Sequence, residues 1–205
     1  MQNYPTTRCA ELAQPTIEPV TLAQAKLHLR VDVDDDNALI TALIIAARQY
    51  CENLSGRTLA SRSYLQTMES FPADGIDIVL RRSPVTAIAS VNYYDATGTD
   101  VAMTVTTDYR TNFNLVPARV RLPVLTKLWA QTYVVDDAVR IIYTAGAADV
   151  NGVNTAPTAA KQTILLLVGH WYENRESVVV GATSNAVDCT VTSLIDSYRI
   201  GDIAL

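Results

Sequence analysis

Residues 164–176 read Ile-Leu-Leu-Leu-Val-Gly-His-Trp-Tyr-Glu-Asn-Arg-Glu, and this stretch decides the helical part of the fold. Pro157 fits the first position of a helix that runs into it. One face of that helix carries Ala160, Ile164, Leu167, Val168 and Trp171, and Leu165, Leu166 and Tyr172 cover much of the remainder. A helix that is apolar nearly all round is buried on both sides. We therefore expect one side to pack in the core, with another subunit as a candidate for the other side.

Two earlier helices complete a body of three main helices. Thr21, with Gln24 three residues later, forms a capping box that starts a short helix ending near Val31. Its apolar stripe is Leu22, Ala25 and Leu29. The acidic run 32–36 supplies carboxylates that cap the next helix, over residues 35–54.

The helix over residues 35–54 has the clearest pattern in the chain. Its predicted core stripe is Ile40, Leu43, Ala47, Cys51 and Leu54. Gly56 fits a C-terminal cap. Ile45 lies on the polar face, with Arg48 and Glu52, so it is either a single exposed residue or part of a contact.

Residues 57–146 change to an alternation of period two, rich in β-branched and aromatic side chains. The clearest segments are residues 64–68, 76–80 and 139–143, with turn chemistry at 72–75 and 95–98. We predict five to seven short antiparallel strands here.

The sequence therefore predicts an α+β fold: a helical body with an inserted small antiparallel β domain and an extended C-terminal tail. The expected division is an N-terminal arm with two helices over 1–56, the β insertion over 57–148, and the third helix with the tail over 149–205. Within the tail, residues 194–200 form a short amphipathic piece that either frays or docks on a neighbour.

Composition limits the classes of function. Charged residues make up only 18% of the chain, against about 25% in typical soluble domains, and apolar residues make up 49%. This deficit indicates that partners cover some of the surface. The net charge is -5 and no basic block occurs, so tight binding to duplex DNA is not expected. No signal peptide or membrane-spanning run is predicted.

Candidate chemical motifs fail on their spacing. Cys9, Cys51 and Cys189 are too scattered for a zinc site or a disulfide framework. His170 and Glu173 have the spacing of metal ligands, but a histidine packed at a helix end explains them better. The acidic run 32–36 fails as a calcium loop. We expect no catalytic, cofactor or metal residues, and no enzyme.

Arginines in the β region allow two interpretations. Arg119 and Arg121 precede Trp129, and basic residues beside an aromatic side chain can contact single-stranded nucleic acid. Alternating arginines equally protect an edge strand against unwanted pairing. The edge-strand interpretation is favoured.

An ordered set of segments resembles the head–tail connector (head-completion adaptor) family of long-tailed bacteriophages. The set comprises residues 18–31, 34–57, 80–85, 91–98, 143–146, Pro157, 170–176 and 194–199. The resemblance implies a non-catalytic ring, commonly of about twelve subunits, between the portal protein and the tail or stopper protein. It also implies that genomic DNA passes through the lumen without sequence-specific binding. The expected location is the virion neck, and the host cytoplasm during assembly.

On this basis we expect a structural subunit that binds below the portal, completes the DNA-filled head and provides the tail attachment site. The candidate interface residues are Ile45, Trp171, Tyr172, Arg175, Leu194, Tyr198 and Arg199. Two alternatives stay open: another neck or tail-completion protein, and a cytoplasmic module that binds a ligand or a peptide.

Overall fold

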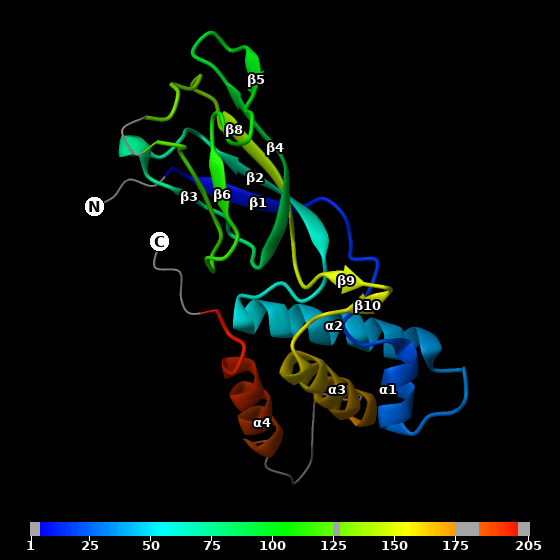
Figure 1. Cartoon of the computed structure of the whole chain (residues 1–205). Helices are drawn as coiled ribbons and strands as arrows, with labels where there is room; N and C mark the ends of the chain where they lie inside the picture. The colour runs from blue at the N-terminus through cyan, green and yellow to red at the C-terminus, as the bar shows by residue number, and fades with distance from the viewer. Residues whose placement is uncertain (1–4, 125–127, 175–184, 201–205) are drawn as a thin grey trace. The chain divides into compact units, whose positions relative to one another are not determined.

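The computed structural model describes residues 5–124, 128–174 and 185–200 (Figure 1). The described chain divides into two compact units. The β unit holds residues 5–15 and 61–146, and the helical unit holds residues 16–60 and 147–200. Helices and antiparallel sheets together confirm the α+β class.

The helical unit contains four helices and one small hairpin. They are α1 (Leu22–Leu29), α2 (Asn37–Ser55), α3 (Thr158–Glu173) and α4 (Asn185–Asp196), with the hairpin of β9 (Asp149–Val150) and β10 (Val153–Asn154). α2 packs against the other three helices. Their shared core is built from small and branched apolar side chains, including Ala25, Ile40, Ala47, Ile164, Val168 and Ile195.

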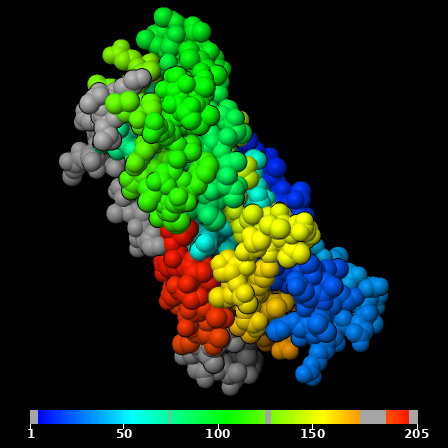
Figure 2. Space-filling model, in the orientation of Figure 1, coloured from blue at the N-terminus to red at the C-terminus, as the bar shows by residue number. Residues whose placement is uncertain are grey.

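α4 corrects two expectations about the C-terminal region. The tail was expected to be extended and the body to have three main helices, whereas residues 185–196 form a fourth helix. Val191 and Ile195 of α4 are buried in the same core as α3. Figure 2 shows α4 (red) directly against residues 147–173 (yellow to orange). Burial of this apolar stripe holds the amphipathic piece in place.

The caps of α1 and α2 follow the sequence with one exception. The capping box is present: Thr21 Oγ1 accepts from Gln24 N at 3.2 Å, and Gln24 Oε1 accepts from Thr21 N at 2.9 Å. Gly56 ends α2 in the left-handed region at φ 66°. Asp36, however, makes no side-chain cap hydrogen bond. Its carboxylate accepts a hydrogen bond from the Tyr172 hydroxyl, a partner that local sequence does not reveal.

The predicted stripe of α2 is correct only in part. Ile40, Ala47 and Cys51 are buried, but Leu54 is 44% exposed and Ile44 is buried instead. The stripe shifts because two charged residues of the expected polar face, Arg48 and Glu52, also turn inward.

The β unit contains two antiparallel sheets. The five-stranded sheet has the order β1-β2-β8-β4-β5 and the three-stranded sheet the order β3-β7-β6. The strands are β1 (Thr7–Glu11), β2 (Arg62–Met68), β3 (Ile78–Val79), β4 (Val85–Tyr94), β5 (Asp100–Ala102), β6 (Arg110–Asn112), β7 (Arg119–Arg121) and β8 (Val139–Ala145). Seven of them lie between residues 57 and 146, within the predicted number.

The N-terminal arm belongs to this β unit. The predicted domain over 1–56 groups the arm with the helices, whereas residues 7–11 form β1 and pair with β2 in antiparallel register. An edge of β2 satisfies the arm's backbone hydrogen bonds, which a helix surface does not offer.

Buried polar side chains join the two sheets of the β unit. Gln66 of β2 is fully buried; its Nε2 donates to Val79 O at 2.9 Å and its Oε1 accepts from Arg81 N at 3.0 Å. The Tyr143 hydroxyl accepts from Arg82 N at 3.2 Å.

Among the described residues, none of the helices is long and apolar enough to cross a membrane.

Candidate assembly surfaces

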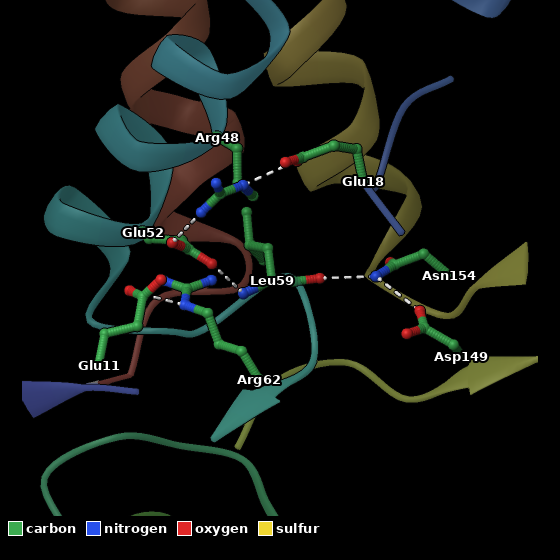
Figure 3. Close-up of polar contacts among 8 residues, drawn as sticks. All are labelled: Glu11, Glu18, Arg48, Glu52, Leu59, Arg62, Asp149 and Asn154. Atoms are coloured by element: carbon green, nitrogen blue, oxygen red, sulfur yellow. Dashed lines mark hydrogen bonds and ion pairs between the residues drawn. The ribbon is translucent and has the colours of Figure 1, made fainter. Parts of the chain in front are cut away.

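A buried polar network organises the helical unit around Arg48 (Figure 3). Arg48 is 1% exposed; its Nε donates to Glu18 Oε2 at 2.7 Å and its Nη1 to Glu52 Oε2 at 3.0 Å. Two carboxylates on one guanidinium compensate the desolvation that would otherwise make this burial costly. Arg48 and Glu52 stand one helical turn apart on α2, so both reach the same side of the helix.

The network continues from α2 to the β9–β10 hairpin. Glu52 Oε1 accepts from Leu59 N at 2.7 Å, and Leu59 O accepts from Asn154 Nδ2 at 3.0 Å. Lys161 Nζ of α3 then donates to Asn154 O at 2.6 Å. Segments distant in sequence are thereby fixed to one another. Sequence reasoning missed this network, because charged residues at helical spacing usually form a solvated face.

The aromatic residues of the 164–176 stretch lie at the margin of the helical core. Trp171 and Tyr172 are half-buried and pack against the core cluster. The Trp171 ring meets Tyr50 of α2 edge to face, with centroids 6.1 Å apart at 84°. Tyr50 is itself 43% exposed. The pair therefore offers partly exposed aromatic surface held at fixed geometry, which is typical of residues that anchor interfaces.

The two histidines lie at the end of α3 and beside it in the described structure. The Asn174 amide donates to His170 O at 2.9 Å, closing the end of α3. A methyl group placed on Gly169 would lie 3.5 Å from His28 Nε2, an ordinary van der Waals contact, so the His28 ring lies over this position of α3. Within residues 5–124, 128–174 and 185–200, no three histidine, cysteine or acidic side chains gather to hold a metal ion.

The remaining predicted interface residues differ in exposure. Ile45 and Leu194 are half-buried. Arg199 is exposed and lies 3.7 Å from Asp196. Tyr198 is 5% exposed and belongs to the helical core, which gives it a packing role within the subunit. Arg175 lies outside the described residues.

Burial also shapes the titration of groups beside Tyr198. Burial raises the pKa of the Cys51 thiol to about 11, and it raises the pKa of the Tyr198 hydroxyl as well. Both groups therefore stay neutral at physiological pH. They pack as apolar contacts, and Cys51 lacks the thiolate character of a reactive cysteine.

Exposed apolar side chains mark further candidate contact surface on the helical unit. Leu27 of α1 is 82% exposed and Leu54 of α2 is 44% exposed. Leu27 falls outside the predicted stripe of α1, so its exposure could have been inferred from helical periodicity.

Both interpretations of the β-region arginines need correction. Trp129 is 9% exposed; it stacks on Phe71 at 4.9 Å and donates from Nε1 to Ile76 O at 2.8 Å, so it offers no free face to a nucleobase. β7, which carries Arg119 and Arg121, is the central strand of its sheet. The arginines therefore do not protect an edge strand.

Comparison with known proteins finds a family match over part of the chain. Residues 19–113 match the phage gp6-like head-tail connector protein family. The family resemblance predicted from the sequence is thereby confirmed. The matched range contains α1, α2 and the strands from β2 to β6.

Solved structures extend the likeness in fold to nearly the whole chain. The virion of a native gene transfer agent particle contains a chain with a TM-score of 0.74 and 22% identity, covering 95% of this chain and 96% of that chain. The neck of the empty particle, computed with C6 symmetry, matches with a TM-score of 0.72 and 20% identity, over 96% and 97%. The neck of the native particle, computed with C12 symmetry, matches with a TM-score of 0.68 and 20% identity, over 96% and 97%. No curated protein sequence matches the chain.

Proposed function

We propose that this chain is a structural, non-catalytic subunit of the neck of a phage-type particle. The carrying observation is the match of residues 19–113 to the head-tail connector family. The fold of neck chains extends over 95% or more of the chain, which supports the same role for the part that the family match does not cover.

In this proposal the subunits form a closed ring below the portal protein. The similar neck structures were computed with C6 and C12 symmetry, which supports a ring of about twelve copies here. The ring completes the DNA-filled head, provides the attachment site for the tail or stopper protein, and lets genomic DNA pass without sequence-specific contacts. A net charge of -5 suits a channel that does not retain DNA.

Subunit contacts are proposed to use the aromatic margin of the helical unit. Trp171, Tyr172, Ile45 and Leu194 are each only half-buried within the subunit, so a neighbouring copy can complete their burial. Arg199 and Arg175 are proposed to set the register through ion pairs. Such contacts are individually weak, but in a closed ring many weak contacts together are sufficient to hold the assembly.

Native mass spectrometry of the purified chain, alone and with the portal protein of the same particle, tests this role. We expect either a ring of the chain itself or a ring assembled on the portal. A chain that stays monomeric and never binds the portal would overturn the proposal.

A further inference from the structure

The β unit carries two exposed surfaces of opposite charge, each with exposed apolar side chains beside the charges. We name the first the acidic tip: Tyr133, Val134 and Val135, with Asp95, Asp136 and Asp137. We name the second the basic face: Arg110, Arg119 and Arg121 on the three-stranded sheet, with Leu115 and Val116 in the loop beside them. Figure 1 shows β5, which adjoins the tip, at one end of the β unit, with β3 and β6 nearer its middle.

Apolar exposure defines the centre of the acidic tip. Val134 is 96% exposed, Tyr133 50% and Val135 42%. Tyr133 and Val135, with Gly98, line a hollow of about 340 Å³. Exposed apolar surface that is contiguous and rimmed by polar groups marks an interaction site more often than isolated apolar residues do.

The acidic tip is held in a fixed shape. Tyr133 N donates to Tyr94 O at 3.0 Å, and Tyr94 N donates to Ala138 O at 2.9 Å, so the loop is bonded to the end of β4 on both sides. The Tyr133 ring packs beside Gly98, where a methyl group would lie 3.8 Å from it. A contact made by this loop therefore requires little ordering, which favours binding.

The rim of the tip keeps an uncompensated negative charge. Asp100 nearby is neutralised by Arg140 at 2.6 Å. Asp136 and Asp137 are exposed, and their carboxylates make no ion pair with the rest of the described chain. Asp95 is fixed in the turn by Thr97, whose hydrogen bond lowers the pKa of that carboxyl and keeps it ionised.

The basic face has the opposite balance. Arg110 and Arg121 are directly paired across β6 and β7, so their side chains share one face of the sheet, and Arg119 lies two residues along on the same face. Asp77 lies 2.6 Å from Arg121 and 3.6 Å from Arg119. Arg110 is exposed and has no ion-pair partner among the residues that the structure describes. Three arginines against one aspartate leave this face with surplus positive charge.

Exposed apolar residues flank the basic face, whereas at the acidic tip they occupy the centre. Leu115 is 40% exposed and Val116 50%, and their loop leads directly into Arg119. One surface therefore offers aliphatic side chains beside guanidinium groups, and the other offers an apolar hollow beside carboxylates.

We propose that the acidic tip of one copy binds the basic face of the next. The occupant of each surface is thus a second copy of this chain, chosen by charge complementarity and by the exposed apolar side chains that both surfaces offer. Two different surfaces in contact form a head-to-tail interface, the kind that closes into rings. This assignment rests on the proposed neck ring and specifies where the β units of neighbouring copies meet.

Charge reversal of the full chain tests the interface. The tip variant is Asp136→Arg with Asp137→Arg, the face variant is Arg110→Glu with Arg119→Glu, and a third chain carries all four changes. Self-association is measured by sedimentation from low to physiological ionic strength, after circular dichroism has verified folding. Matched controls reverse exposed charges elsewhere on the β unit, with Glu69→Arg and Arg8→Glu.

Self-association of the wild type should weaken as salt rises. Each two-residue variant should raise the dissociation constant by about tenfold or more, and the four-residue chain should return to within about threefold of wild type. The controls should match wild type. Reversal variants that assemble like wild type, or a four-residue chain that is no better than its parents, would overturn the interface.

A cross-link provides a second measurement that does not depend on charge. In a Cys189→Ser background, a chain with Val134→Cys is mixed with a chain with Val116→Cys under mild oxidation. Heterodimers well above the half share of a statistical 1:2:1 mixture support the proposed contact, and a statistical mixture refutes it.

The outcomes separate this interface from the proposed function. A wild-type chain that is monomeric at every ionic strength but assembles on the portal refutes the interface and leaves the neck role in place. Tip variants that lose binding to the portal while self-association is unchanged assign the tip to another component and also refute it. A chain that neither self-associates nor binds the portal removes both proposals.

Discussion

Arg48 and Glu52 form a fully buried ion pair one turn apart on α2, with Arg48 Nη1 3.0 Å from Glu52 Oε2. Helical spacing predicts that both residues lie on a solvated face of α2, whereas the structure buries them. Glu52 also accepts from the Leu59 backbone, so the pair connects α2 to the segment that follows it.

Loss of the buried Arg48 should be much more harmful than loss of a lysine in an exposed ion pair. Arg48→Met removes the buried guanidinium that Glu18 and Glu52 share, and removing one partner of a buried pair typically costs about 3–5 kcal/mol. Urea unfolding followed by circular dichroism measures the change. Lys26→Met is the matched control, because Lys26 pairs with the exposed Asp34 and its loss should change stability far less. Equal effects from the two variants would show that the Arg48 network contributes nothing beyond a surface pair.

Cys51 should make stability fall as the solution becomes alkaline. Its folded pKa is raised to about 11, whereas an unfolded thiol has a pKa of about 8.5. Between these values the unfolded chain releases the proton and the folded chain keeps it, so rising pH favours unfolding. At pH 10 the loss should approach about 2 kcal/mol. Unfolding curves at pH 8 and pH 10 should show a smaller drop for Cys51→Ala, and identical drops would contradict this.

Thiol reactivity follows from the same burial. Cys189 is exposed and Cys51 is buried, so a thiol reagent at pH 8 should label Cys189 rapidly and Cys51 only after unfolding. Mass spectrometry of the labelled peptides distinguishes them. Rapid labelling of Cys51 in the folded chain would show that its pocket opens.

Two glycines should respond in opposite directions to alanine. Gly56 has φ +66°, and an L-residue in that region costs about 1–2 kcal/mol, so Gly56→Ala should destabilise the chain. Gly169 lies inside α3, where alanine is favoured by about 1 kcal/mol, and the added methyl group would meet the His28 ring at 3.5 Å and Leu29 at 4.0 Å, both ordinary van der Waals contacts. Gly169→Ala should therefore be neutral or stabilising. Thermal melting compares the two variants, and a strong loss at Gly169 would mean that α1 and α3 cannot separate further.

Trp171 distinguishes core packing from assembly. The side chain is half-buried and meets Tyr50 edge to face, so Trp171→Ala should leave the subunit folded but weaken ring formation. The control is Trp129→Ala: Trp129 is stacked in the β core, and its loss should cost about 3–5 kcal/mol. Circular dichroism measures whether each variant is folded, and native mass spectrometry measures whether it forms the ring. Unfolding of the Trp171→Ala subunit would assign Trp171 to the core instead.

The sequence by itself determined the features that depend on local periodicity and on backbone chemistry. The Thr21 capping box, the Gly56 cap, the helical run into Trp171 and the alternation along residues 139–143 each follow from neighbours within one or two turns. The order of such segments also predicted the connector family. These features are readable because hydrogen bonding and side-chain direction repeat with a fixed period.

Tertiary structure alone decided the features that join distant segments. Arg48 is buried because Glu18 and Glu52 meet it, Asp36 leaves its cap for Tyr172, and residues 7–11 become a strand because β2 offers an edge. Residues 185–196 are helical where α3 gives their apolar side a core to cover. Local pattern cannot specify these outcomes, because the free energy of a buried charge or of an added strand depends on which partner the fold brings to it.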